Sequence, residues 1–456
     1  MQSTGLLKSR HSNLDFWSEV RAVTRLAIPV AIGELGWIAM GTVDTIMIGG
    51  LGPAAIGAIG IGSSAFYTCA IFGFGLLFGL DTLVSQSYGA GNREDCHHSL
   101  VQGIYIALCL TPILMLIFNW MPPFFAVLKI DPEVTRLAGP FLRTLSLSTL
   151  PLILYAALRR YLQGIGHVRP IMFTLLTANL INWFFNWLLI RGHWGFPALG
   201  VVGSALSTTC ARVYMAALLA FFIWWYERDL RKSVPPLWRK PDWTRIIRLL
   251  RLGFPAAVQI LLEIGAFGTA AVFAGKISAN SMAAHQIALN CAAITFMVPL
   301  GIQSAAAVAV GQAIGRRQPD VARRSGFIAL GLGVSFMACA AITFVASPRP
   351  ILHVYTHDSQ VVGIAVRLLG LAALFQLFDG IQTVATGALR GLGQTRIPML
   401  VNFAGYWLFG LPLGYWLCFV IGWGIYGVWW GLTLALIVIA LILLFTWNRE
   451  SKTVLA

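Results

Sequence analysis

Five acidic side chains fall inside long apolar stretches of the sequence, where a charge is costly. They are Glu34, Asp44, Asp81, Glu263 and Asp379, five of the 17 acids in the chain. Insertion scales put an aspartate at the centre of a membrane helix at about 2.5–3.5 kcal/mol. Packing alone would not sustain five such costs, so we expect these side chains to have a function.

A carboxylate in an apolar medium can handle an ion. Desolvation disfavours its charged form, so the group can bind a proton on one side of a membrane and release it on the other. Ionised, the same oxygens can coordinate Na⁺. The alternative is an acid near a helix end that touches interfacial water. That alternative carries most weight for Asp81, less for Glu34, and least for Asp44, Glu263 and Asp379.

Other polar and aromatic residues could complete such sites. Asn182 and Asn186, in "NLINWFFNWLL", lie four apart and therefore on one helical face. Their amides could bind a cation or a carboxylate, or form an ordinary interhelical hydrogen bond. Tyr406 is one of several aromatic residues that could line a cavity for a flat or cationic molecule, or simply pack. For His285, a structural role as a hydrogen-bond donor is favoured over a functional role.

Long apolar helices must position these residues. The chain of 456 residues is 58% hydrophobic and 11% charged, whereas soluble domains are about a quarter charged. Its apolar stretches are long enough to cross a bilayer. We predict an all-α integral membrane protein with twelve transmembrane helices, at residues 26–50, 55–80, 99–121, 136–158, 169–191, 200–225, 252–275, 283–310, 326–346, 362–388, 398–420 and 425–447.

The basic residues predict the orientation of these helices. The net charge is +15, and with the N-terminus inside, 24 of the 32 basic residues fall on the inner side. This distribution follows the positive-inside rule, so the charge does not indicate nucleic-acid binding. We expect a multi-pass protein of the plasma membrane, the inner membrane in bacteria, with both termini cytoplasmic. The first residues are polar and charged, which favours a cytoplasmic arm over a cleavable signal peptide.

The two halves of the sequence repeat each other. "RLAIP" at 25–29 matches "RLGFP" at 251–255, and "QGIGHVRP" at 163–170 resembles "RGLGQTRIP" at 390–398, both at offsets near 226. Six helices per half make the repeats parallel, as in transporters whose sites lie near the midplane. We predict a cytoplasmic arm at 1–25, a six-helix lobe at 26–226, a basic cytoplasmic linker at 227–250, a second six-helix lobe at 251–447 and a cytoplasmic tail at 448–456.

Four motifs in this order resemble the multidrug and toxic compound extrusion (MATE) family. They are "VDTIMIGGLG" at 43–52, "LDTLVSQSYGAGN" at 80–92, "AAHQIALN" at 283–290 and "ALRGLGQTRIP" at 388–398. The resemblance spans nearly the whole chain. The chain looks most like the NorM-type branch, although "LDTLVSQSYGAG" leans toward the motif of the eukaryotic relatives. Twelve helices in two six-helix lobes are also the architecture of this family.

The resemblance implies roles for particular residues. Asp44 matches the aspartate of helix 1, and Asn182 and Asn186 match the polar positions of helix 5 that face it. Glu263 and Asp379 match the acids of helices 7 and 10 in the NorM branch. The family implies efflux of organic cations or amphipathic drugs, driven by Na⁺ or H⁺. It also implies a monomer with no cofactor, with Na⁺ bound at Asp44 or between the other two acids.

Other functions remain open at this stage. A flippase for lipid-linked oligosaccharides, from the same superfamily, would need a basic cavity, whereas Arg212 is the single basic residue expected within the spans. An intramembrane enzyme would need a nucleophile or metal motif, and the sequence holds neither HExxH nor GxSxG. A channel fits a two-lobe repeat with dispersed acids less well than alternating access does. Seven scattered cysteines predict neither a disulfide framework nor a zinc site.

Overall fold

The structure is a computed structural model of the chain, and it describes residues 3–127, 130–228 and 240–453. Within these ranges every regular element is a helix. Eleven of the described helices are long and apolar enough to cross a membrane, and a bent pair of helices makes a twelfth crossing. The predicted all-α fold with twelve transmembrane helices is therefore confirmed.

Two compact units divide the chain. The α2–α9 unit holds residues 32–88 and 92–257, and the α11–α17 unit holds residues 1–31, 89–91 and 258–456. Each described unit has its own apolar core, built mainly from alanine, leucine, isoleucine and aromatic side chains. Apolar residues cover most faces of these helices, as expected where lipid and not water surrounds them.

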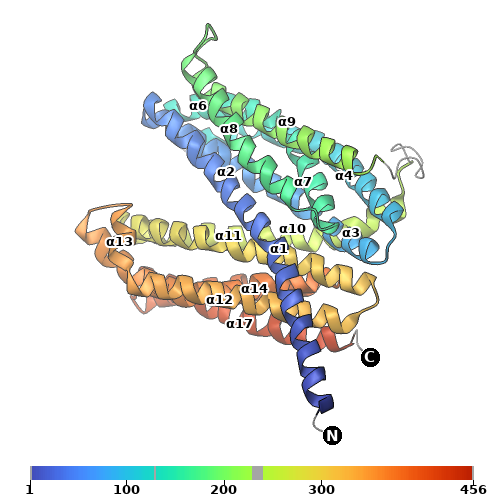
Figure 1. The fold of residues 1–456 in the computed structure, drawn as a ribbon. Helices are drawn as coiled ribbons and strands as arrows, with labels where there is room; N and C mark the ends of the chain where they lie inside the picture. Colours follow the sequence, from blue (N-terminus) through green and yellow to red (C-terminus); the bar gives the residue numbers. More distant parts are fainter. Residues whose placement is uncertain (1–2, 128–129, 229–239, 454–456) are drawn as a thin grey trace. The chain divides into compact units, whose positions relative to one another are not determined.

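The α2–α9 unit begins within the long helix α1 (Ser3–Ile48) (Figure 1). Its further helices are α2 (Pro53–Leu76), α3 (Gly79–Gly89), α4 (Arg93–Trp120), α5 (Pro122–Val127), α6 (Pro132–Ser146), α7 (Thr149–Gly164), α8 (Arg169–Arg191) and α9 (Gly200–Tyr226). Helices α8 and α9 pack side by side over much of their length. The pair α6 and α7, at the predicted span 136–158, is bent by 49°.

The main part of the α11–α17 unit begins within α10 (Trp243–Ile277), at residue 258. It continues with α11 (Ala279–Gly315), α12 (Pro319–Ala346), α13 (Pro348–His353), α14 (Ser359–Gly391), α15 (Arg396–Asn402), η3 (Phe403–Gly410), α16 (Leu411–Tyr415), η4 (Trp416–Val420) and α17 (Ile425–Thr453). Helix α14 packs against α11, α12 and α17, so it is the central helix of this unit. The span at 398–420 is helical throughout, but η3 and η4 have the wider π-helical winding.

The predicted repeat is visible in matching turns. Two residues after the end of α7 lies Gly166 with a φ of 80°, and two residues after the end of α14 lies Gly393 with a φ of 86°. The next amide closes each turn in the same way, from His167 to the carbonyl of Leu162 at 2.8 Å and from Gln394 to Leu389 at 2.9 Å. Glycine is favoured at both sites because the left-handed conformation crowds a Cβ atom. The same helix ending 227 positions apart supports the internal duplication.

Helix α1 differs from the arm expected at residues 1–25. The helix runs from Ser3 to Ile48 without a break. Val23 and Ala27 are buried in the core of the α11–α17 unit. The compact units divide the helix between residues 31 and 32, close to Pro29, and not at residue 26. Most of the linker, 229–239, lies outside the described residues, and the assignment of arm, linker and tail to the cytoplasm stays a prediction.

Candidate ion- and cargo-binding sites

Asp44 lies on α1 at the centre of a small polar cluster. Its Oδ1 accepts hydrogen bonds from Nδ2 of Asn182 at 3.0 Å and from Nδ2 of Asn186 at 2.6 Å. Its Oδ2 accepts a hydrogen bond from the hydroxyl of Thr208 at 3.1 Å. Three neutral donors thus converge on one carboxylate, and they come from α8 and α9, the two helices that pack together.

The spacing of the two asparagines builds this cluster. Asn182 and Asn186 lie one turn apart on α8, and both are fully buried. Nδ2 of Asn186 also donates to Oδ1 of Asn182 at 3.2 Å. Oδ1 of Asn186 is buried and has no hydrogen-bond partner among the described residues. The site therefore contains an amide oxygen that could bind a cation.

Glu263 and Asp379 form the second acidic site. Glu263 comes from α10, and Asp379 lies on α14 about one helical turn before Gln382, whose amide donates to Glu263. Neither forms a salt bridge among the described residues. Glu263 accepts a hydrogen bond from the amide of Gln382, whereas no described side chain hydrogen-bonds to Asp379. Two acids in one buried polar cluster favour binding of a proton or a cation.

Gln382 links the second site to the rest of its unit. Its Nε2 donates to Glu263 and, at 3.0 Å, to Oδ1 of Asn402. Its Oε1 accepts from the Tyr406 hydroxyl at 3.0 Å. Asn402 ends α15 and Tyr406 lies in the π-helical η3, so this irregular stretch supplies two of the three partners of Gln382. Tyr406, which could have lined a cavity or simply packed, is buried and donates its hydroxyl proton to this glutamine.

The other two membrane acids form ion pairs. Glu34 accepts from a terminal guanidinium nitrogen of Arg159, and Asp81 binds Nη1 of Arg160 at 3.2 Å. Both arginines are buried in α7, and Arg160 also lies 3.9 Å from the centre of the Phe78 ring. Arg212 is therefore not the single buried basic residue. Helix α7 bends away from α6, and the last turns of α7 bring Arg159 and Arg160 into the unit.

His285 lies in neither acidic cluster. It is fully buried on α11, and its Nδ1 accepts a hydrogen bond from Nε1 of Trp429 at 3.1 Å. This geometry puts the ring proton on Nε2, which has no partner among the described residues. The structure shows a packing contact with α17 for this histidine and no hydrogen bond to a carboxylate.

Sequence reasoning missed Thr208, Gln382 and Asn402. All three are polar residues within predicted spans, and each is at least nine-tenths buried. Their polarity within apolar stretches was a usable signal, because a buried polar group needs a partner. The sequence did not say which carboxylate each would contact, since that depends on how the helices pack.

Comparison with known proteins identifies the family of the chain. The MatE family matches residues 29–188 and 255–416, one segment in each half of the chain. A protein of Mesorhizobium japonicum named "Probable multidrug resistance protein NorM" is 35% identical over 442 residues, which are 95% of this chain and 94% of that protein.

Two solved structures share the fold. The eukaryotic MATE transporter AtDTX14 superposes with a TM-score of 0.87 at 21% identity, over 96% of this chain and 98% of that one. A transporter from Pyrococcus furiosus superposes with a TM-score of 0.85 at 19% identity, over 96% of this chain and 97% of that one, and is described as having a binding pocket of reversed polarity. The family match and the relative together show that the chain belongs to the MATE family, with NorM among its relatives.

Proposed function

We propose that the protein exports organic cations or amphipathic drugs in exchange for Na⁺ or H⁺, by alternating access. The observation that carries this proposal is the Glu263–Asp379 pair, two membrane carboxylates that Gln382 brings into one cluster and that form no salt bridge among the described residues. Such a pair attracts a cationic cargo and also a coupling ion. The name of the NorM relative, a multidrug resistance protein, supports the same cargo class.

Charge also argues against the flippase alternative. A cavity for a lipid-linked diphosphate needs positive charge that is free to bind the phosphates. Arg159 and Arg160 are buried but are neutralised by Glu34 and Asp81. Arg212 donates to the hydroxyls of Ser148 at 2.5 Å and Tyr67 at 2.9 Å. The neighbour with a reversed pocket polarity illustrates that one fold can hold pockets of different charge, so the cargo must be argued from these residues.

Coupling would work through competition. The ion and a cationic cargo compete for carboxylate charge at Asp44, at the Glu263–Asp379 pair, or at both. One charge moving inward gains about 2.3 kcal/mol per 100 mV. This work favours release of cargo only if ion and cargo interact differently with the two states of the transporter. Ion loading from outside would then expel the cargo.

Efflux from drug-sensitive cells tests the proposal. Cells that express the protein should expel ethidium or a fluoroquinolone faster than cells with an empty vector. Removal of external Na⁺, or a rise in external pH, should slow the efflux and identify the coupling ion. The proposal would be wrong if cells with well-expressed protein expelled both compounds no faster than cells with an empty vector.

Orientation is part of the same proposal. We propose that both termini face the cytoplasm, because 24 of 32 basic residues then lie inside. Tags at the two termini should be reachable only after the membrane is made permeable. A cysteine at Ser233 should behave likewise, although this position lies outside the described residues. Labelling of intact cells at these positions would reverse the assignment.

A further inference from the structure

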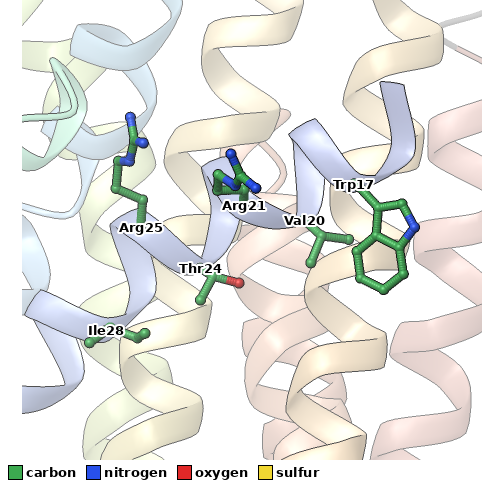
Figure 2. Close-up of a pocket in the computed structure, with 6 residues that line it drawn as sticks. All are labelled: Trp17, Val20, Arg21, Thr24, Arg25 and Ile28. Carbon is green, nitrogen blue, oxygen red and sulfur yellow. The ribbon is translucent and has the colours of Figure 1, made fainter. Parts of the chain in front are cut away.

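Helix α1 carries a groove that the transport proposal does not use. Its volume is about 410 Å³, and its lining residues all come from one stretch of the helix, which is part of the α11–α17 unit (Figure 2). The residues are Trp17, Val20, Arg21, Thr24, Arg25 and Ile28. Their spacing of three and four places them along one side of the helix.

The opposite side of this stretch is already occupied. Val23 and Ala27 are buried in the core of the unit, and Glu19 forms a salt bridge with Arg324 of α12. The groove side is more open, since Trp17 is 66% exposed and Ile28 is 54% exposed, and of its apolar residues only Val20 packs partly against that core. The described part of the unit thus fixes one face of the helix and leaves most of the other face open.

Two arginines give the groove its charge. Arg21 and Arg25 are exposed, lie one turn apart, and extend from the same side of the helix in Figure 2. Neither forms a salt bridge or a hydrogen bond with any described side chain, whereas Arg324 nearby in the unit is neutralised by Glu19. Val20, Thr24 and Ile28 lie along the other side of the ribbon, so charge and apolar surface are separated across the groove (Figure 2).

The length of the helix places the groove at the edge of the membrane. The continuous candidate span Phe16–Leu51 has 36 residues, or about 54 Å at 1.5 Å per residue. The hydrocarbon core is about 30 Å thick, so the span reaches into the headgroup region. The apolar stretch begins at Leu26, directly after the last of these arginines, which puts Ile28 beside acyl chains and Arg21 and Arg25 at the level of the headgroups. An exposed tryptophan such as Trp17 is typical of this boundary.

We propose that this groove binds the headgroup of an anionic phospholipid. Arg21 and Arg25 would bind the phosphate with their guanidinium groups, whose planar donor arrays match its oxygens. Thr24 offers a hydroxyl to the polar linkage of the lipid, and Ile28 and Val20 contact its first methylenes. A cationic cargo would be repelled by the same arginines. The proposal is therefore independent of the cargo and the coupling ion.

Native mass spectrometry of the delipidated full-length protein tests this site. We expect phosphatidylglycerol to remain bound at concentrations at which phosphatidylcholine has dissociated. The variant Arg21→Gln/Arg25→Gln should weaken phosphatidylglycerol binding by about tenfold, which corresponds to about 1.4 kcal/mol. The variant Arg21→Lys/Arg25→Lys, which keeps the charge but loses the planar donor array, should bind with intermediate strength.

A charge-matched control separates a defined site from general attraction. Arg349 and Arg367 are exposed arginines in the same unit, on α13 and α14. Their double glutamine variant should bind phosphatidylglycerol like the unaltered protein. Equal losses in both double variants, equal binding of the two lipids, or full competition by inorganic phosphate at millimolar concentration would each overturn the proposal. Both glutamine variants should elute as a single species in size-exclusion chromatography. If only Arg21→Gln/Arg25→Gln aggregates, the affinity of Arg21→Lys/Arg25→Lys for phosphatidylglycerol is the test, and binding as tight as that of the unaltered protein would overturn the proposal.

Discussion

The two acidic sites satisfy their carboxylates in opposite ways. Asp44 receives three hydrogen bonds from neutral donors, two on one oxygen and one on the other. At the second site Gln382 donates to Glu263, and no described side chain hydrogen-bonds to Asp379. The first site surrounds one carboxylate with donors, whereas the second holds two acids that would repel each other if both were ionised.

This difference indicates that the two sites respond differently to a bound ion. Donors around a carboxylate lower the cost of its negative charge, because the hydrogen bonds replace part of the water. Two acids that would repel each other when both are ionised are stabilised by a bound proton or cation. We therefore expect the Glu263–Asp379 site to depend strongly on bound ion or cargo, and the Asp44 site to adjust the competition between them.

Neutralising the second site should have the largest effect. Glu263→Gln and Asp379→Asn keep the shape of each side chain and remove one charge of the repelling pair. We expect each variant to insert normally and to lose nearly all drug efflux, because the remaining acid no longer needs a cation. Drug resistance and membrane abundance are the measurements. Wild-type resistance in either variant would reduce that acid to a packing residue.

Changing the first site should alter the competition. With the unaltered protein, higher Na⁺ or lower pH should weaken drug binding in a purified sample. Asp44→Asn removes the charge that Asn182, Asn186 and Thr208 stabilise, so the dependence on the coupling ion should shrink. Asp379→Asn serves as the comparison from the other site. If drug affinity in the unaltered protein is indifferent to both ions over the range that drives transport, direct competition is wrong and coupling acts through conformation alone.

The sequence predicted which charged residues lie within the spans, but it did not predict which side chains they contact. Apolar length predicted the spans, and the rarity of acids within them identified Asp44, Glu263 and Asp379 as candidates. The bend between α6 and α7 was not predicted, because Leu147 and Ser148 carry no strong helix-breaking signal. The partners of Glu34 and Asp81 were missed for the same reason, since that bend leads into the helix that carries both arginines.

Gln382 offers a sharper test of the second site. Replacing it by leucine leaves Glu263, Asn402 and Tyr406 without the hydrogen bonds that this amide provides. An unsatisfied buried polar group costs about 1–3 kcal/mol, so we expect efflux by Gln382→Leu to fall by about tenfold. Gln376→Leu is the matched control, because Gln376 is equally buried on α14 but is bound to Thr295 at 2.9 Å. Equal losses in the two variants would show a general effect on α14 and no special role of Gln382.

The pair Glu34–Arg159 should affect stability more than transport. Removing one partner of a fully buried pair costs about 3–5 kcal/mol, and the side chains here are 17% and 4% exposed. We expect Glu34→Gln to lower the midpoint of thermal unfolding, and Glu34→Gln/Arg159→Met to recover part of the loss. Glu19→Gln is the control for a more exposed pair, because Arg324 is 43% exposed and such pairs contribute about 0–1 kcal/mol.

Efflux per folded molecule distinguishes this pair from the two acidic sites. If Glu34 serves only to neutralise Arg159, its glutamine variant should transport at the unaltered rate once protein levels are matched, with the same dependence on Na⁺ and pH. A changed ion dependence in a stable Glu34→Gln protein would make Glu34 a third coupling acid. The ion pair seen here would then belong to one state of the transport cycle, and Arg159 would act as an internal cation that replaces the coupling ion in that state.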